Sequence, residues 1–301
     1  MRVALVINAT AGSMSGALTP DIIREKIAAS GLTAAPEADD SAPLPARLAA
    51  AAAQPGIEAL VVAGGDGTIA CAASLLAGRD MPLGLLPLGT MNLLVKDLGV
   101  PLDINAAIET VRAGHSKKID LGAVNGHVFL TSSLLGMPAR MAKHREAQRG
   151  GVDLRGMARF AGGLLRHLGR YPKLDVTATI DGQERRWRFR LLAVVNNDFV
   201  ERPGNLLVRE PLDGGKLTVY LLEHLSLWSM ARLGVGFAVG DWHRLPGLQR
   251  FPADDLVIDS RHRALRVMND GEVRLIDAPL RYRSRPQALV VLVPPTSLET
   301  P

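Results

Sequence analysis

The sequence predicts a layered α/β domain of alternating strands and helices, followed by a β-rich domain. Apolar strands alternate with helices over residues 1–121, and from Ile119 onward one strand-like segment follows another. A chain of 301 residues that is 47% hydrophobic can form one large domain or two of ordinary size. The change of pattern near Leu121 favours two.

In the first domain we expect buried strands at residues 2–7, 59–63 and 83–86, and helices at residues 21–30 and 46–54. The stretch AAPEADDSAPLPA is expected to be a loop, or a loop around a poor strand. Strands that alternate with helices form a parallel sheet between helical layers, and such sheets bind ligands at the carboxyl ends of their strands.

The second domain is predicted from short segments rich in β-branched and aromatic residues. These segments cover residues 119–124, 127–133, 173–180, 185–197, 216–222, 255–259, 264–268 and 288–293. TIDGQE is a hairpin turn with Asp181-Gly182 at its tip. Helical insertions are expected at about 138–170 and 225–240. We assign residues 1–121 to the first domain and 122–301 to the second, and leave open a return of the last strand to the first.

Charge is concentrated in one segment. Residues 140–190 hold 13 Lys and Arg against 5 Asp and Glu, although the whole chain has a net charge of only +5. At helical spacing this segment places leucines on one face and four arginines on the other, namely Arg155, Arg159, Arg166 and Arg170. Two interpretations stay open: a core-packed helix with a solvated face, or a helix that contacts anionic lipid headgroups.

Composition indicates the compartment and limits the partners. Cys71 is the single cysteine, so no intrachain disulfide can form, and the N-terminus has too short an apolar run for a secretory signal. We therefore expect a cytoplasmic protein that associates peripherally with membranes. Trp187 and Phe189 alternate with arginines as in an ordinary sheet, so no nucleic-acid partner is predicted. A homodimer is left open.

The motif VVAGGDGTIA places three glycines and an aspartate where a buried strand turns into a helix. Gly64, Gly65 and Gly67 would allow a phosphate to approach the main chain at a helix N-terminus. Because a bare carboxylate repels phosphate, Asp66 implies Mg²⁺ or a donor hydroxyl nearby. The alternative is a tight turn in which Asp66 caps the following helix.

Two further turns favour the ligand-binding interpretation. PLGTMN follows the next strand and supplies Gly89, Thr90 and Asn92, while VINATAGS follows the first strand and supplies Asn8 and Ser13. Three polar, glycine-bearing turns on one edge of a sheet predict a nucleotide site. The sequence has neither a G-x-x-x-x-G-K-[ST] loop nor a G-x-G-x-x-G after the first strand, which excludes the two commonest nucleotide motifs.

The set of motifs resembles the diacylglycerol kinase catalytic-domain family of lipid kinases, which includes bacterial lipid kinases and sphingosine kinases. GGDGT at 64–68 is similar to the family's nucleotide signature, PLGTMN at 87–92 to its second motif, and IDLGAVN at 119–125 to the entry to its second domain. NDGE at 269–272 is similar to its C-terminal acidic motif. GGDGT alone is shared with NAD kinases, whereas the ordered set of four is strongly specific and spans nearly the whole chain.

The resemblance implies a kinase in which ATP, Mg²⁺ and a lipid hydroxyl meet between an α/β nucleotide-binding domain and a β-sandwich lipid domain. Carried over position by position, it assigns nucleotide binding to Asn8, Ser13, Gly64, Gly65, Asp66, Gly67, Thr68, Gly89, Thr90 and Asn92. The acceptor is most simply diacylglycerol, with a sphingoid base or phosphatidylglycerol as alternatives.

The catalytic residues implied by the resemblance are Glu272, Asp270 and Asp66. Because a lipid hydroxyl is a poor nucleophile, a carboxylate that accepts its proton is a sensible device. We expect Glu272 to be this base, with Asp270 orienting it or completing a water and Mg²⁺ network with Asp66, although the roles of Asp270 and Glu272 could be exchanged. On local sequence alone, Asp270-Gly271 is simply a hairpin tip.

One departure from the family pattern concerns a structural cation. The family commonly reads Asp-Gly-x-Leu at this cation, whereas PLDGGKLTV places Gly214 where the aspartate belongs and Asp213 one residue early. Asp66 and Asp213 are therefore the metal-ligand candidates. Two other functions stay open: an NAD kinase-like enzyme, and a non-catalytic lipid-binding protein of the same fold.

Overall fold

The computed structural model describes residues 1–8, 18–36, 41–139, 172–200, 208–209, 211–223 and 247–295. Four sequence predictions fall outside these residues. They are the nucleotide-binding position Ser13, the four-arginine helix face, the helical insertion at 225–240 and, except for residues 138 and 139, the helical insertion at 138–170.

The first part of the chain forms the parallel sheet that the sequence predicts. Strands β1 (Arg2–Ile7), β3 (Ala59–Gly64) and β4 (Leu83–Pro87) pair in parallel, and the short β2 (Thr33–Ala34) pairs with β1 at the edge. Every residue of β3 is buried, which requires cover on both faces of the sheet.

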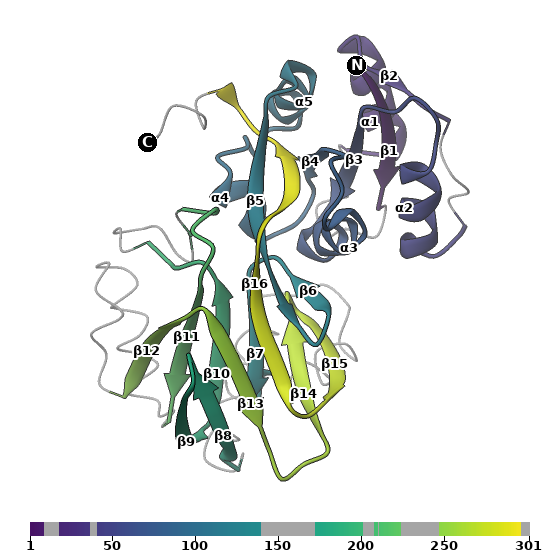
Figure 1. Ribbon diagram of the computed structural model, residues 1–301. Coiled ribbons are helices and arrows are strands. Elements are labelled where there is room, and N and C mark those ends of the chain that lie inside the picture. The colour runs from purple at the N-terminus through teal and green to yellow at the C-terminus, as the bar shows by residue number, and fades with distance from the viewer. Residues whose placement is uncertain are drawn as a thin grey trace, which may run out of the picture.

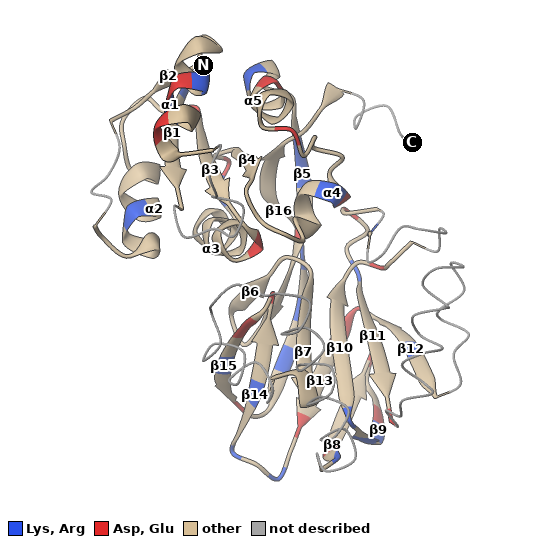
Figure 2. Ribbon diagram, turned by 180° about the vertical axis from the view of Figure 1, so that it is seen from behind, with Lys and Arg blue, Asp and Glu red and all other residues tan. Residues whose placement is uncertain are grey.

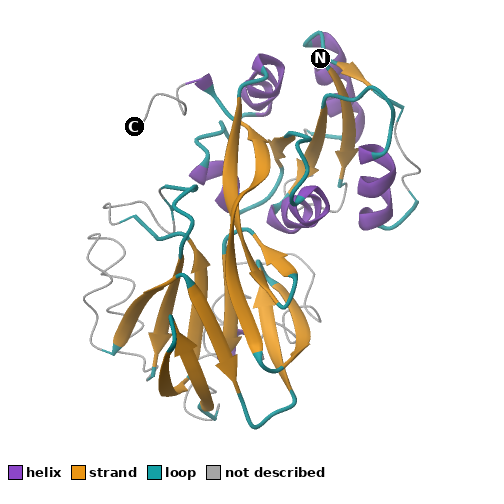
Figure 3. Ribbon diagram, viewed as in Figure 1, coloured by secondary structure: helices purple, strands orange, loops and turns teal. Residues whose placement is uncertain are grey.

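Within the described residues, the helices α1 to α5 lie around this sheet (Figure 3). They are α1 (Pro20–Ala29), α2 (Leu44–Ala52), α3 (Asp66–Leu76), α4 (Leu93–Asp97) and α5 (Ile104–Ala113). Side-chain oxygens cap two of them, since Thr19 Oγ1 accepts the N–H of Ile22 before α1 and Asp103 accepts two N–H groups before α5. α1 packs on α5 and α2 packs on α3, so the sheet carries two helix pairs.

The second part is a sandwich of two antiparallel layers (Figure 1). The six-stranded layer contains β12 (Leu248–Ala253), β11 (Leu217–Leu222), β10 (Leu191–Asn196), β7 (Ser132–Gly136), β14 (Ala264–Asn269) and β15 (Glu272–Asp277). The other layer contains β9 (Gln183–Phe189), β8 (Leu174–Ile180), β13 (Asp255–Asp259), β16 (Leu280–Leu292), β5 (Ser116–Val124) and β6 (His127–Phe129). Side chains of both layers share one buried apolar cluster.

Two long strands, β5 and β16, run side by side from the helix-bearing part into the sandwich (Figure 1). The final residues of β16 pair with β4 in parallel at Val291 and Leu83, while its first residues pair with β13 in the sandwich. The register of β16 on β5 shifts between Arg285 and Leu289. One ten-stranded sheet therefore continues through both parts of the molecule.

The predicted strands are broadly confirmed, but β12, β15 and the first residues of β16 were not predicted, and two predicted segments each divide into two strands. Residues 185–197 were expected to form one strand, but the chain breaks at Arg190, so that β9 joins one layer and β10 the other. Residues 127–133 likewise divide into β6 and β7, because the N–H groups of residues 130–132 bind the Asp270 carboxylate instead of a neighbouring strand. The Asp181-Gly182 tip is confirmed, with φ values of 47° and 82°.

Candidate functional site

The predicted turns meet at the carboxyl edge of the parallel sheet. Ile7 pairs with Ala63 and Gly64 with Pro87, so the chain leaves β1, β3 and β4 at neighbouring points. Asn8, just beyond β1, donates its Nδ2 to the Thr68 hydroxyl at 2.8 Å. The sheet therefore brings residues of three sequence motifs into one place.

The GGDGT and PLGTMN turns are in backbone contact. A Cβ placed on Gly89 would lie 2.7 Å from the Gly65 Cα, and one on Gly65 would lie 3.2 Å from the Gly89 Cα. The Asn92 side chain holds the second turn from within, since Oδ1 accepts the Gly89 N–H and Nδ2 donates to the Gly89 carbonyl. Asn92 itself has a left-handed backbone, with φ of 48°.

The Asp66 carboxylate joins these two turns. Oδ2 accepts the N–H of Asn92 at 3.0 Å and Oδ1 accepts the N–H of Leu93 at 2.6 Å. Asp66 therefore satisfies the first N–H groups of α4, although it stands at the start of α3. This capping across elements differs from the alternative considered for the sequence, in which Asp66 caps its own helix.

The glycines of GGDGT differ in their surroundings. A Cβ on Gly64 would lie 2.6 Å from atoms of Thr68, whereas a Cβ on Gly67 would meet nothing within 4 Å. Gly67 is exposed in the first turn of α3, and among the described residues no hydrogen-bond acceptor faces its N–H or that of Asp66. Of the three glycines, Gly67 is the one open to a ligand. Thr90 is exposed beside it in the second turn.

The NDGE motif forms the turn between β14 and β15, with φ of 47° at Asp270 and 93° at Gly271. Asp270 is partly buried, and its carboxylate accepts the N–H groups of Leu130, Thr131 and Ser132 at 2.6, 2.8 and 3.1 Å. Burial raises the pKa of Asp270, while these bonds and Arg209 offset part of the rise. Asp270 therefore holds a neighbouring loop in place.

Glu272, two residues further on, is in a different environment. Its carboxylate is 58% exposed and lies 3.3 Å from the Arg274 guanidinium. Burial raises the pKa of the Cys71 thiol in α3, the Glu272 charge raises it further, and Arg274 lowers it. Cys71 itself is half-buried.

Asp120, Asp97 and Arg209 are polar residues near this site to which the sequence analysis assigned no role. Asp120 is buried and accepts the N–H groups of Gly215 and Gln287 at 2.6 and 2.8 Å. Asp97 and Arg209 form a buried ion pair at 2.6 Å. Asp120 lies within the quoted IDLGAVN motif, whereas Arg209 stands in a loop without any periodic pattern that could have marked it.

The residues present fit Mg²⁺ at one candidate position better than at the other. Each Asp66 oxygen keeps a lone pair beyond its N–H contact, which suits a cation held mainly by waters and phosphates. The Asp213 carboxylate instead faces the Lys117 ammonium at 3.8 Å. Within the described ranges, no group of three or more His, Cys, Asp or Glu side chains could hold a metal.

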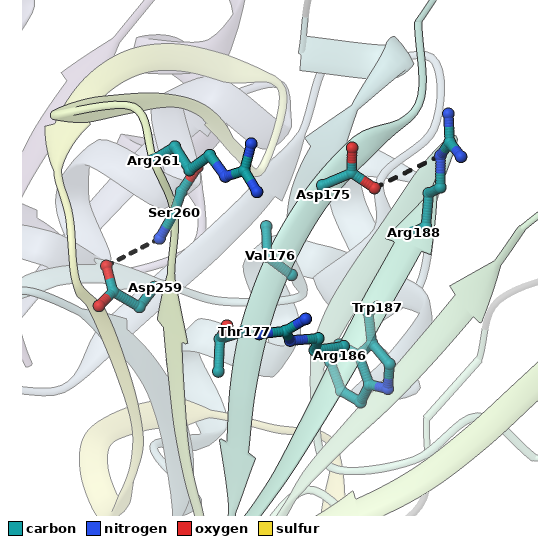
Figure 4. Close-up of a pocket in the computed structure, with 9 residues that line it drawn as sticks. All are labelled: Asp175, Val176, Thr177, Arg186, Trp187, Arg188, Asp259, Ser260 and Arg261. Carbon is teal, nitrogen blue, oxygen red and sulfur yellow. Dashed lines mark hydrogen bonds and ion pairs between the residues drawn. The ribbon is translucent and has the colours of Figure 1, made fainter.

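A separate hollow of about 460 Å³ lies on β8, β9 and the chain after β13 (Figure 4). Arg186, Arg188 and Arg261 line it, and Asp175 pairs with Arg188 at 3.4 Å. None of the predicted site residues contributes to this hollow. Among the helices that the structure describes, none is long and apolar enough to cross a bilayer.

Two family models match the chain in succession. The diacylglycerol kinase catalytic domain matches residues 2–124, and the YegS C-terminal NAD kinase beta sandwich-like domain matches residues 132–293. A Pseudomonas fluorescens protein named "Probable lipid kinase YegS-like" is 31% identical over 261 residues, which cover 83% of this chain and 82% of that protein.

Solved structures share the fold. A diacylglycerol kinase from Bacillus anthracis strain Sterne superposes with a TM-score of 0.69 at 21% identity, over 98% of both chains. A yeast NADH kinase in complex with NADH gives a TM-score of 0.56 at 12% identity, over 97% of this chain and 83% of that chain. The two-part architecture therefore recurs in both kinds of kinase.

The substitution Gly67→Ala tests whether a ligand approaches the first turn of α3. Because the added methyl meets no protein atom and alanine favours helix over glycine, we expect unchanged or slightly higher stability, by up to about 1 kcal/mol. We expect weaker ATP binding, measured by calorimetric titration. Gly65→Ala is the contrasting variant, since its methyl presses on Gly89 and should lower the melting temperature. Unchanged ATP affinity in Gly67→Ala would contradict a phosphate site at this turn.

The Cys71 thiol reports the position of Glu272. Glu272→Gln removes a negative charge that disfavours the thiolate, so the thiol pKa should fall, whereas Arg274→Gln should raise it. The pH dependence of iodoacetamide alkylation measures this pKa, and no other cysteine competes. Identical profiles for both variants and the parent would show that the Glu272 charge does not act on the Cys71 thiol.

Proposed function

The chain belongs to the diacylglycerol kinase catalytic-domain family of lipid kinases, and on this premise we propose that it transfers the γ-phosphate of ATP to a lipid hydroxyl, with diacylglycerol as the leading acceptor. One observation supports this proposal above all. The helix α3, whose first turn is the GGDGT motif, contacts β6, and the residues after β6 are bound by Asp270, two residues before the exposed Glu272. A phosphate bound at that turn and a hydroxyl in front of Glu272 would belong to one site.

We assign nucleotide binding to the edge of the parallel sheet. The free N–H groups at the start of α3 and the open face of Gly67 suit phosphate oxygens. Thr68 and Asn8 form the neighbouring wall through their shared hydrogen bond, and Thr90 offers an exposed hydroxyl. Gly64, Gly65, Gly89 and Asn92 serve this site by building the two turns.

Asp66 is the residue that we assign to Mg²⁺. Its remaining lone pairs suit contact through waters of the hydrated cation, while its N–H contacts keep the carboxylate fixed. When bound with ATP, Mg²⁺ would neutralise charge on the phosphates. The chain itself contributes the fixed Asp66 carboxylate and the N–H donors around the phosphates.

Glu272 is our candidate for the general base. Its carboxylate is solvent-accessible and makes one ion-pair contact, with Arg274, so it can accept a proton from a hydroxyl. Asp270 is poorly suited to this role, because its oxygens already accept three backbone N–H groups. We therefore assign Asp270 to support of the turn that carries Glu272.

The basic segment at residues 140–190 supports a membrane-associated enzyme. Its charge would attract anionic headgroups, to which each basic residue near the surface contributes about 1 kcal/mol. Contact through Arg155, Arg159, Arg166 and Arg170 would keep the enzyme at a substrate that does not leave the bilayer.

Glu272→Gln should lower kcat by roughly 10²–10⁴ with little change in ATP affinity, because the amide cannot accept the proton. Steady-state kinetics on the true acceptor, with calorimetric titration of ATP, measures both. Arg266→Gln on the neighbouring strand β14 provides the control, and we expect its kcat to stay close to that of the parent, because Arg266 is exposed and has no role in the proposed site. Retention of most turnover in Glu272→Gln would remove Glu272 from the reaction.

The acceptor is identified by offering γ-labelled ATP with diacylglycerol, a sphingoid base, phosphatidylglycerol and NAD in separate reactions. We expect label in the organic phase with one or more lipids and none in NADP, with products identified by mass spectrometry. Label in NADP would favour the NAD kinase alternative that the fold also allows. Transfer to none of the acceptors would favour a non-catalytic lipid-binding protein.

A further inference from the structure

A buried ion pair joins the two parts of the molecule. The Arg209 guanidinium donates to Asp97 Oδ2 through Nε at 3.0 Å and through Nη2 at 2.6 Å, and the Arg209 N–H donates to Asp97 Oδ1 at 3.0 Å. Both side chains are 1% exposed. Asp97 ends α4 in the helix-bearing part, which lies above the ends of β10 and β11 (Figure 2).

From Arg209 the contacts lead to the NDGE turn. Its Nη1 donates to the carbonyls of Leu130 and Asn196 at 2.6 and 3.0 Å. Leu130 donates its own N–H to the Asp270 carboxylate. Leu130, between β6 and β7, is therefore held at its carbonyl oxygen by Arg209 and at its N–H by Asp270. Asp270 stands two residues before Glu272 in the NDGE turn.

From Asp97 the contacts lead to the GGDGT turn. Asp97 is the last residue of α4, a helix of five residues whose first N–H group binds Asp66. So short a helix transmits a displacement of one end directly to the other. The Asp66 carboxylate of GGDGT is thus connected to the Asp270 carboxylate of NDGE. The connection runs through the short helix α4 and then through the hydrogen bonds that link Asp97, Arg209 and Leu130.

The buried Asp97–Arg209 ion pair adds little net stability to the contact between the two parts. Removing two charges from water offsets most of what they gain by pairing, and apolar side chains of similar size often stabilise a buried contact as well or better. A fork of directed hydrogen bonds, by contrast, fixes distance and angle as apolar packing does not. Geometry is therefore the property that Asp97 and Arg209 supply.

We propose that the Asp97–Arg209 pair is a positioning device, which sets the turn bearing Asp270 and Glu272 at its working distance from the GGDGT turn. Neither residue touches a reacting atom. The catalytic side of this inference rests on the proposed function, in which Glu272 accepts a proton from the hydroxyl that attacks the phosphate. The geometric side is independent of it.

The test uses Arg209→Met, which removes the guanidinium, and Arg209→Lys, which keeps the charge but not the fork. In Arg209→Met we expect kcat to fall by roughly 10–100-fold while the KM for ATP stays within about twofold, because small displacements of reacting groups cost rate more than binding. Arg209→Lys should lie between this variant and the parent. Arg209→Met should also shift the Cys71 thiol toward its ordinary pKa, because displacement of the NDGE turn would weaken the effect of the Glu272 charge on that thiol.

Ile258→Ala is the matched control, since Ile258 is fully buried in the sandwich core. It should lower the melting temperature without moving the Cys71 alkylation profile or changing kcat of the folded enzyme. If Arg209→Met fails to fold, Arg209→Lys decides by the same two measurements.

An unchanged Cys71 profile in the Arg209 variants would overturn the inference, as would a shifted profile with parental kcat. The thiol measurement needs no turnover. If the parent transfers phosphate to no acceptor, the proposed function fails, while a shifted Cys71 profile would still support the geometric role of the pair.

Discussion

The close contact of two glycine turns is the constraint on which the rest of the site depends. Only because Gly65 and Gly89 lack side chains can the chain leave β3 and β4 in backbone contact. That proximity lets the Asp66 carboxylate, at the start of α3, reach the N–H groups that open α4. The position of α4 in turn places Asp97 against Arg209. A side chain at either glycine would therefore affect the contact between the two parts, beyond its own turn.

The chain uses one device repeatedly, in which a carboxylate binds backbone N–H groups of a distant segment. Asp66 binds the start of α4, Asp270 binds residues 130–132, and Asp120 binds the N–H groups of Gly215 and Gln287. Hydrogen bonds to a charged acceptor stabilise by about 1.5–3 kcal/mol each, more than neutral ones. Most of these N–H groups stand in loops or at the start of a helix or strand, and that of Gln287 stands where the register of β16 shifts. At these places the carboxylates supply the hydrogen-bond partner.

Sequence patterns over a few residues predicted the elements that depend on neighbouring residues. The parallel strands, the helices around them and the Asp181-Gly182 turn follow from apolar periodicity and turn chemistry over a few residues. The break at Arg190 could not be predicted, because β9 and β10 are both good strands and only their partners in different layers separate them. The pairing of Asp97 with Arg209 spans 112 residues and leaves no periodic trace in either segment. The motifs predicted the residues of the proposed site but not the hydrogen bonds that support them.

Because Asp66 and Asp270 bind backbone N–H groups, mutating either residue does not separate a catalytic role from a structural one. In Asp270→Asn, the amide nitrogen would face backbone N–H groups where an acceptor is needed, leaving donors buried without partners. Asp66→Asn has the same defect, since both oxygens of Asp66 accept N–H groups. Loss of activity in either variant would follow from a displaced loop or from lost chemistry alike. Glu272 accepts no backbone N–H among the described residues and is exposed, so its chemistry can be separated from its support of the fold.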